Sequence, residues 1–284
     1  MSSYRFCRTD DIALLVDALN RCWAPYVPDE PPMTAALFKR SIRDLQIWCS
    51  SCMVAFAGPD PIGVLIGAKR PSGTLIHRIA VHPDHVRQGH GRHLLTSLSS
   101  KLAILGPPRI AAEVPQTLSA ACALFRACGY VEEVLLTDYV LTGDHRDTTD
   151  VAGRFVIPVT VDDLVANGLL GEDNRQVCWE RSIETLTSRK DELKGLALAS
   201  DERIEAHILY IERGEERAEI VSLQTDLNDP RGSLEPLFAH LGARAVNMGF
   251  PKVHPSEIPA QQLATLGFRP TQTYGLYAAT ARPE

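Results

Sequence analysis

The sequence lacks an apolar stretch long enough to cross a bilayer, and its first residues, MSSYRFCRTDD, lack the apolar run of a secretory signal. It also lacks an excess of positive charge, because its 284 residues have a formal net charge of −6. Residues 1–145 contain 14 basic and 13 acidic residues, whereas residues 146–284 contain 15 and 22. We therefore expect a cytoplasmic protein that binds neither membrane nor nucleic acid, with a first half that accommodates a small anion.

The seven cysteines lack the spacing of a disulfide scaffold or of a zinc site. Cys49 and Cys52 form the one C-x-x-C pair, and no second pair completes a metal site. A chain of this length needs no disulfide for stability, so we expect reduced thiols. A structural role is the favoured interpretation of the pair, and a redox role is the alternative.

The length and the 45% hydrophobic content favour two globular domains. A polar segment, residues 141–153, separates two regions in which helical and strand-like patterns follow one another in the same order. LFRACGYVEEVLLTDYV also resembles QLATLGFRPTQTYGLYA, with Gly129 and Gly267 138 positions apart. The sequence thus predicts an α/β fold of two tandem domains, 1–145 and 151–284. Two loosely similar helix-to-strand turns are the alternative explanation.

Hydrophobic periodicity and turn residues predict the elements of each domain. In the first domain we expect an amphipathic helix capped by Asp10 or Asp11, a proline-rich loop, and then strands and helices at 52–58, 62–70, 74–81, 91–106, 109–114, 117–129 and 131–141. In the second domain we expect a helix at 160–170, a long polar helix through Lys194, and then strands and helices at 195–200, 203–212, 217–226, 232–244, 245–249 and 258–278.

The stretch HPDHVRQGHGRHLL, residues 82–95, contains four histidines spaced in pairs three apart. That spacing suits a metal, but proline and glycine interrupt the helix and no cysteine or carboxylate cluster adjoins it, so we expect no metal. A Rossmann loop requires a third glycine where Leu94 stands, and the Gly-Lys-Ser/Thr ending of a Walker loop is absent. What remains is a strand, a Gly-x-Gly loop and a helix start, whose free N–H groups favour an anion such as a pyrophosphate.

IAVHPDHVRQGHGRHLL, residues 79–95, resembles the signature of the GNAT family of acyl-CoA-dependent N-acyltransferases. Val86 departs from the signature, which has Gln or Arg there. The resemblance implies that acetyl-CoA is the acyl donor and that the main chain of Val81 polarises its carbonyl. It implies a cofactor-binding set of Ala80, Val81, His82, Arg87, Gln88, Gly89, His90, Gly91 and Arg92.

AAEVPQTLSAACALFRACGY resembles the next strand and helix of the same family. The resemblance places Glu113 where one branch has a general base, and Phe125 where the family often has a proton-donating Tyr, so Phe125 is left to pack against the CoA. His77, on the preceding strand, is a second candidate base. The alternatives are a solvent-facing strand residue for Glu113 and a packed or surface-exposed residue, the more frequent case, for His77. The loop at 22–33 matches the acceptor side of the family, which makes Trp23 and Tyr26 candidate substrate contacts; hydrophobic plugs are the alternative.

The resemblance implies that each domain is a mixed, mostly antiparallel sheet flanked by helices. When Gly232 is aligned with Gly91, Pro230 replaces Gly89 and removes an amide donor, and Asp226 and Asp229 add negative charge. The second domain is therefore expected to be a degenerate GNAT-like domain without a CoA cradle. Together these features predict an N-acetyltransferase, monomeric or homodimeric, that acts on an amine of a small molecule or peptide. The alternative is a non-catalytic acyl-CoA sensor or scaffold.

Overall fold

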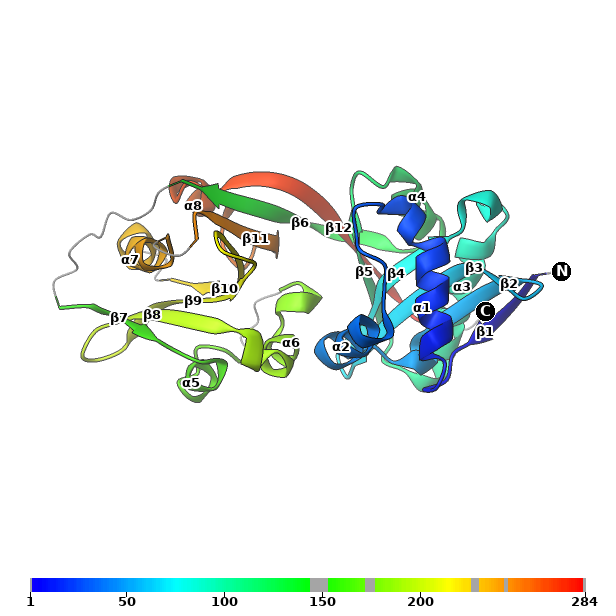
Figure 1. Ribbon diagram of the computed structural model, residues 1–284, viewed down its shortest axis with the longest axis horizontal. Helices are drawn as coiled ribbons and strands as arrows, with labels where there is room; N and C mark the ends of the chain where they lie inside the picture. Colours follow the sequence, from blue (N-terminus) through cyan, green and yellow to red (C-terminus); the bar gives the residue numbers. More distant parts are fainter. Residues whose placement is uncertain (1, 144–152, 172–176, 226–229, 243–244, 283–284) are drawn as a thin grey trace. The chain divides into compact units, whose positions relative to one another are not determined.

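The computed structural model describes residues 2–143, 153–171, 177–225, 230–242 and 245–282. The chain divides into two compact units (Figure 1). Unit 1 comprises Met1–Val134 and Gly275–Glu284, and unit 2 comprises Leu135–Tyr274.

Unit 1 contains both strands and helices along its first 134 residues. The strands are β1 (Ser2–Phe6), β2 (Met53–Ala57), β3 (Asp60–Arg70), β4 (Gly73–Val81), β5 (Arg109–Pro115) and the start of β6 (Val131–Thr142). The α-helices are α1 (Ile12–Cys22), α2 (Ala35–Leu45), α3 (His90–Leu105) and α4 (Ser119–Ala127), with short 3-10 turns at Ala24–Tyr26, Cys49–Ser51 and Pro83–His85.

Unit 2 repeats this order of elements. Its strands are β7 (Phe155–Pro158), β8 (Lys194–Ala199), β9 (Ile204–Glu212), β10 (Arg217–Gln224), β11 (Asn247–Val253) and the start of β12 (Arg269–Thr280). Its helices are α5 (Val161–Ala166), α6 (Ile183–Ser188), α7 (Pro230–Gly242) and α8 (Ala260–Thr265), with 3-10 turns at Trp179–Arg181 and Lys190–Glu192.

The two units exchange the ends of their last strands. β6 begins in unit 1 and continues into unit 2, where it pairs antiparallel with β11, for example at Thr142 opposite Asn247. β12 begins in unit 2 and continues into unit 1, where it lies beside β5. The exchange is why the division differs from the expected domains 1–145 and 151–284: residues 275–284 count with unit 1. Most of the expected linker, 144–152, lies outside the described residues.

The sheet of unit 1 has helices on both faces. Leu94 and Leu98 of α3 and Phe125 of α4 form one buried cluster with Ala112 of β5 and Tyr277 of β12. The other face is covered by α1, which contacts β3 and buries Leu15 and Leu19, and Figure 1 shows α1 and α2 in front of the strands. Because both faces are covered, β3 is almost continuously buried instead of alternating, as is typical of a central strand.

Unit 2 is built in the same way. Leu234 and Phe238 of α7 pack with Ile208 of β9 and Phe250 of β11 on one face of its sheet. On the other face, residues of α5 and α6 form a separate cluster with residues of β8, β9 and β10. Its members include Val161, Leu164 and Leu186 from the helices, and Ala197, Leu209, Ile211 and Val221 from the strands. Of the strand pairs with a described register, β4 with β5 and β10 with β11 are parallel and the others are antiparallel. The expected fold class, mixed and mostly antiparallel sheets with flanking helices, is therefore confirmed.

The element predictions need correction at four points. β1 and α2 were not predicted; α2 begins after Thr34, whose hydroxyl accepts a hydrogen bond from Leu37 N–H at 3.2 Å. The long helix through Lys194 is wrong, because the described part of that stretch forms 3-10 turns and the six-residue helix α6. Asp11 precedes α1 but makes no capping bond there, since its carboxylate binds the guanidinium of Arg5 at 2.9 Å.

Candidate functional site

The end of β4 exposes backbone groups that no neighbouring strand uses. β4 pairs with β5 at Thr74 and Leu75, and beyond these residues the two strands, both fully described, continue without pairing with each other. On its other side, His82 N–H donates to Ile62 O at 2.9 Å. Hydrogen-bonded and non-bonded pairs alternate in an antiparallel ladder, so the peptide groups of Val81, opposite Gly63, point away from β3. The Val81 N–H therefore faces the side on which β5 diverges.

Gly89 and the first turn of α3 follow eight residues later. Gly89 has φ of 88°, and an added Cβ there would meet no heavy atom within 4 Å, so the backbone at this point is open. The first helical bond of α3 runs from His93 N–H to Gly89 O at 3.0 Å, which leaves the N–H groups of residues 89–92 ahead of it. A helix start of this kind attracts anions.

The charged and polar residues around this turn have distinct positions. Arg87, Gln88 and Arg92 are exposed, and Arg87 has φ of 64°. Gly91 is a close-packing position instead, because a Cβ there would lie 2.9 Å from Leu124 Cδ2 of α4. Two arginines beside free amides form a locally cationic surface.

Two histidines of the motif, His90 and His82, make contacts within the protein. His90 is 5% exposed and its Nδ1 is hydrogen-bonded to the hydroxyl of Tyr4 at 2.6 Å, so its side chain packs under β1. Burial, and secondarily the neighbouring His85 and His93, lower the pKa of His90. The imidazole of His82 accepts a bond from Asp84 N–H at 3.3 Å and caps the 3-10 turn. Among the described residues no group of three or more metal-ligating side chains occurs.

The two candidate bases lie on strands at the diverging edge. One face of β5 is buried against α3 and α4 through Ile110, Ala112 and Val114. Because side chains alternate along a strand, the half-buried Glu113 points to the opposite face, the one covered by α1. His77 of β4 is half-buried at a bulge, where the register shifts between Arg78 and Ile76. A bulge re-aims a side chain, so the position of His77 is set by the sheet.

The loop after α1 brings Trp23 and Tyr26 to β4. The Tyr26 hydroxyl donates to Val81 O at 2.7 Å, and burial raises the pKa of Tyr26. Trp23 Nε1 donates to Glu30 Oε2 at 3.3 Å, and the Arg78 guanidinium lies 4.9 Å from the centre of the Trp23 ring. The two predicted acceptor residues therefore lie at the end of β4, together with Glu30 and Arg78, which were not predicted. No local pattern links residues 48 positions apart.

Phe125 lies away from the surface. It is 2% exposed, with its ring centre 5.1 Å from that of Tyr130 and 5.9 Å from that of Tyr277. The predicted packing of Phe125 against CoA therefore has no support in this structure, because almost none of the residue is accessible to a ligand. Its neighbour Tyr277 comes from the exchanged strand β12, and the Tyr277 hydroxyl donates to Glu132 Oε2 at 2.6 Å. Burial raises the pKa of both tyrosines.

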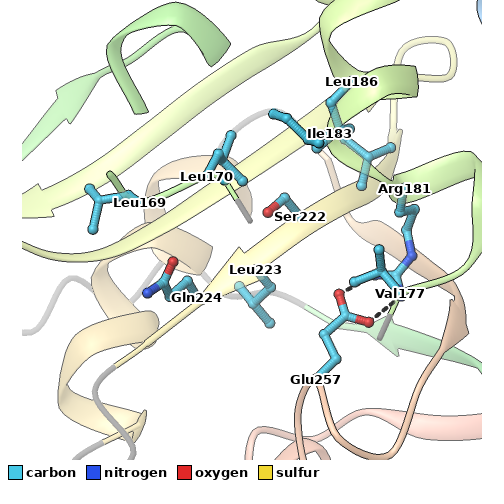
Figure 2. A pocket seen from close by; sticks show the side chains of 12 residues that line it. Leu169, Leu170, Val177, Arg181, Ile183, Leu186, Ser222, Leu223, Gln224 and Glu257 are labelled. Carbon is cyan, nitrogen blue, oxygen red and sulfur yellow. Dashed lines mark hydrogen bonds and ion pairs between the residues drawn. The ribbon is translucent and has the colours of Figure 1, made fainter. Parts of the chain in front are cut away.

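Unit 2 has a pocket at the end of its fourth strand, β10 (Figure 2). β10 likewise pairs with β11 at its start, from Arg217 to Glu219. The pocket is lined by residues 221–224 of β10 together with Leu169, Leu170 and Leu186. Figure 2 shows Arg181 and Glu257 at one side of it, connected by their ion pair. The loop with Asp226 and Asp229 lies outside the described residues, as do the side chains of Pro230 and Arg231, so the predicted loss of a cradle in unit 2 stays a prediction.

The Arg181 guanidinium is engaged by protein groups on several sides. It forms a paired contact with Glu257, and it donates to Cys178 Sγ at 3.4 Å and Lys252 O at 3.2 Å. The two charged side chains are 1% and 6% exposed. Burial alone would lower the pKa of Arg181, but Glu257 and Cys178 outweigh it and raise the pKa. Arg181 and Glu257 therefore neutralise each other's charge and leave no net charge for a ligand in the pocket.

Comparisons with known proteins agree with this geometry. The sequence model of the Acetyltransferase (GNAT) family matches residues 13–130. The [Ribosomal protein bS18]-alanine N-acetyltransferase of Escherichia coli K12 is 38% identical over 72 residues, which is 25% of this chain and 49% of that protein. The chain thus matches about half the length of the curated relatives.

Solved structures show the fold of the whole chain. A tandem GNAT protein from the clavulanic acid biosynthesis pathway superposes with a TM-score of 0.68 at 14% identity, covering 100% of both chains. A GCN5-related N-acetyltransferase from Sphaerobacter thermophilus gives 0.69 at 14% identity, covering 99% of this chain and 96% of that one. Residues 13–130, which are less than half of the chain, are thus similar to the GNAT family. The fold of the chain, over the full length, is that of the tandem form.

The described part of the chain contains no helix with the length and apolar character needed to span a membrane. All seven cysteines are free thiols, and Cys49 and Cys52 are buried. Burial raises the pKa of Cys52, which is the behaviour of a structural cysteine and not of a reactive one.

Proposed function

We propose that unit 1 is an acetyl-CoA-dependent N-acetyltransferase that acts on an amine of a small molecule or peptide. The observation that carries the proposal is the end of β4: the Val81 N–H faces the diverging strand β5, and the open helix start at Gly89 follows it. The match of residues 13–130 to the GNAT family supports the same conclusion.

The backbone of this chain would hold the donor. The N–H groups of residues 89–92 and the guanidinium groups of Arg87 and Arg92 suit a pyrophosphate, because they supply aligned donors and positive charge. When bound, acetyl-CoA supplies the thioester acyl group. The Val81 N–H would donate to the acyl carbonyl oxygen and stabilise the negative charge that develops there.

Glu113 is the proposed general base, with His77 as the second candidate. Glu113 lies on the α1-covered face of β5, the face on which Trp23 and Tyr26 reach β4. A base there would take the proton from the ammonium so that the amine nitrogen forms the new C–N bond while the C–S bond breaks. Phe125 is buried and has no acidic proton to donate, so CoA would leave as the thiolate without protonation from that position. A thiol of ordinary pKa can leave as the anion near neutral pH.

The donor site is tested by Gly89→Pro, measured by calorimetry with CoA. Proline fixes φ near −65°, which φ of 88° does not allow, so the cradle would be disrupted. Gly58→Pro is the control, because Gly58 has φ of 61° in an open turn between β2 and β3. We expect Gly89→Pro to abolish CoA binding and Gly58→Pro to retain it. Retained affinity in Gly89→Pro would refute the placement of the site.

Catalysis is tested by Glu113→Gln in a thiol-release assay over a panel of amines. We expect unchanged CoA affinity and a rate lower by about 10²–10⁴-fold, the usual contribution of a general base. Glu133→Gln, which removes a carboxylate paired with Arg109 on the surface of the same unit, is the matched control. Tight CoA binding without transfer to any amine would favour the alternative, an acyl-CoA sensor.

A further inference from the structure

We infer that Arg78 binds a carboxylate of the acceptor, so that the substrates are amines that carry a carboxylate group. The inference rests on the proposed function, because it assigns a substrate class to the same site. It starts from an arginine on β4, three residues before Val81, that neither the family signature nor the sequence pattern marks.

Arg78 is held on the acceptor side of the sheet by two contacts. Its guanidinium lies over the Trp23 ring, 4.9 Å from the centre, and Nη2 is 3.2 Å from Glu30 Oε2. Stacking on an aromatic face orients the planar group while leaving its N–H edges free. Among the described residues these are the partners of Arg78, so the other N–H donors of its guanidinium have no acceptor in that part of the chain.

The surroundings leave this charge available to a ligand. The Arg78 side chain is 20% exposed, whereas that of Glu30 is 46% exposed on the loop after α1. Glu30 Oε2 is shared between Arg78 and Trp23 Nε1. A guanidinium has five N–H donors and can bind a carboxylate through two parallel hydrogen bonds. One exposed carboxylate, whose oxygen is shared with Trp23, does not use all of these donors.

Arg78 also lies at a useful distance from the proposed reaction centre. Three residues along a strand span about 10 Å, so the Cα atoms of Arg78 and Val81 are separated by roughly that length. Tyr26, hydrogen-bonded to Val81 O, and Trp23, stacked on Arg78, belong to one loop that bridges the two positions. An acceptor with its amine beside Val81 and its carboxylate at Arg78 would lie along this loop.

The experiment uses ω-amino acids of increasing chain length and the matching ω-amino amides, which differ in the charge of one end. Transfer from acetyl-CoA is followed by thiol release with the full-length protein. We expect kcat/KM to favour the acid over the amide by about 10–100-fold at the best chain length, as for a charge-assisted hydrogen bond. Arg78→Gln should reduce that ratio to about one.

Two further variants sharpen the test. Glu30→Gln removes the competing carboxylate and should raise the acid-to-amide ratio above that of the wild type. Arg21→Gln removes an exposed arginine of α1, paired with Asp17 and Asp60, and should leave the ratio unchanged. An unchanged ratio in Arg78→Gln, or a wild-type preference for the amides, would overturn the inference while transfer itself would uphold the proposed function.

A binding arm separates failure of the inference from failure of the proposed function. Calorimetry measures the affinity of the N-acetylated acids and amides in the presence of CoA, without turnover. Binding of the acids that is lost in Arg78→Gln would support the carboxylate site even if no amine is acetylated. Equal binding of acids and amides would overturn it.

Discussion

The guanidinium of Arg78 in unit 1 and that of Arg181 in unit 2 have different surroundings, although both lie near the fourth strand of their unit. Arg181 is bound by Glu257, Cys178 and a main-chain carbonyl, and its charge is neutralised inside the fold. Arg78 has a face on Trp23 and one exposed carboxylate. In the same architecture, Arg181 thus forms a structural ion pair, whereas Arg78 remains partly accessible from the surface. The comparison indicates where a ligand is expected.

The largest expected effect comes from the strand exchange. Deleting residues 275–284 removes the strand beside β5 and the fully buried Tyr277 from unit 1. Loss of one large buried aromatic side chain costs about 3–5 kcal/mol, a large part of the roughly 5–15 kcal/mol that stabilises a domain. We expect unit 1 to lose its native amide protection in hydrogen exchange.

A chain that ends at Arg282 is the control for this deletion, since it keeps all of β12 and the bond from Ala281 N–H to Pro108 O. Native protection of β2 to β5 in the deleted chain would show that unit 1 does not depend on the exchanged strand.

The next largest effect distinguishes the two arginines. Arg181→Met would leave the buried Glu257 carboxylate without its partner, a change that costs about 3–5 kcal/mol. Arg78→Met would break a partly exposed pair worth about 0–1 kcal/mol. In guanidinium chloride titrations, we expect Arg181→Met to lower the free energy of unfolding more than Arg78→Met does. The double variant Arg181→Met/Glu257→Leu should recover much of the loss; equal losses in the two single variants would contradict the comparison.

The smallest effect compares one histidine in each unit. Burial lowers the pKa of His90 in unit 1 and of His254 in unit 2, although Glu257 partly opposes the shift at His254. The unfolded chain, with an ordinary pKa of about 6.5, then binds these protons more readily than the folded one. This contribution to stability is therefore present above that pKa and is lost as the pH falls below it.

We expect His90→Gln and His254→Gln each to reduce the loss of unfolding free energy between pH 7.5 and pH 5.5, and the double variant to reduce it most. Denaturant titrations at the two pH values measure this. A wild-type loss that both single variants retain in full would mean that other groups control the acid sensitivity.

Local signals allowed the sequence to predict residues 74–106 well. A run of strand formers, a Gly-x-Gly turn and leucines at helical spacing each depend on neighbours along the chain, and β4, the turn and α3 follow them closely. α2 was also within reach, since Thr34 is a good cap and an amphipathic pattern follows it.

The features that the sequence did not predict depend on distant contacts. Nothing in a strand pattern shows which sheet its far end joins, so the exchange of β6 and β12 was missed. The contact of Arg78 with Trp23 and Glu30 joins segments about 50 residues apart, and the burial of Phe125 depends on Tyr277, which lies 152 positions further along the chain.

The exchanged end of β12 is synthesised long after the rest of unit 1. Unit 1 receives its strand beside β5 after about 140 further residues have been made, which takes on the order of 10 s at the usual pace of a ribosome. Until then the edge of β5 is open, and an unpaired strand edge is a template for pairing with another chain. The first 134 residues of the nascent protein are therefore a candidate client for chaperones until Gly275 and the residues after it emerge from the ribosome.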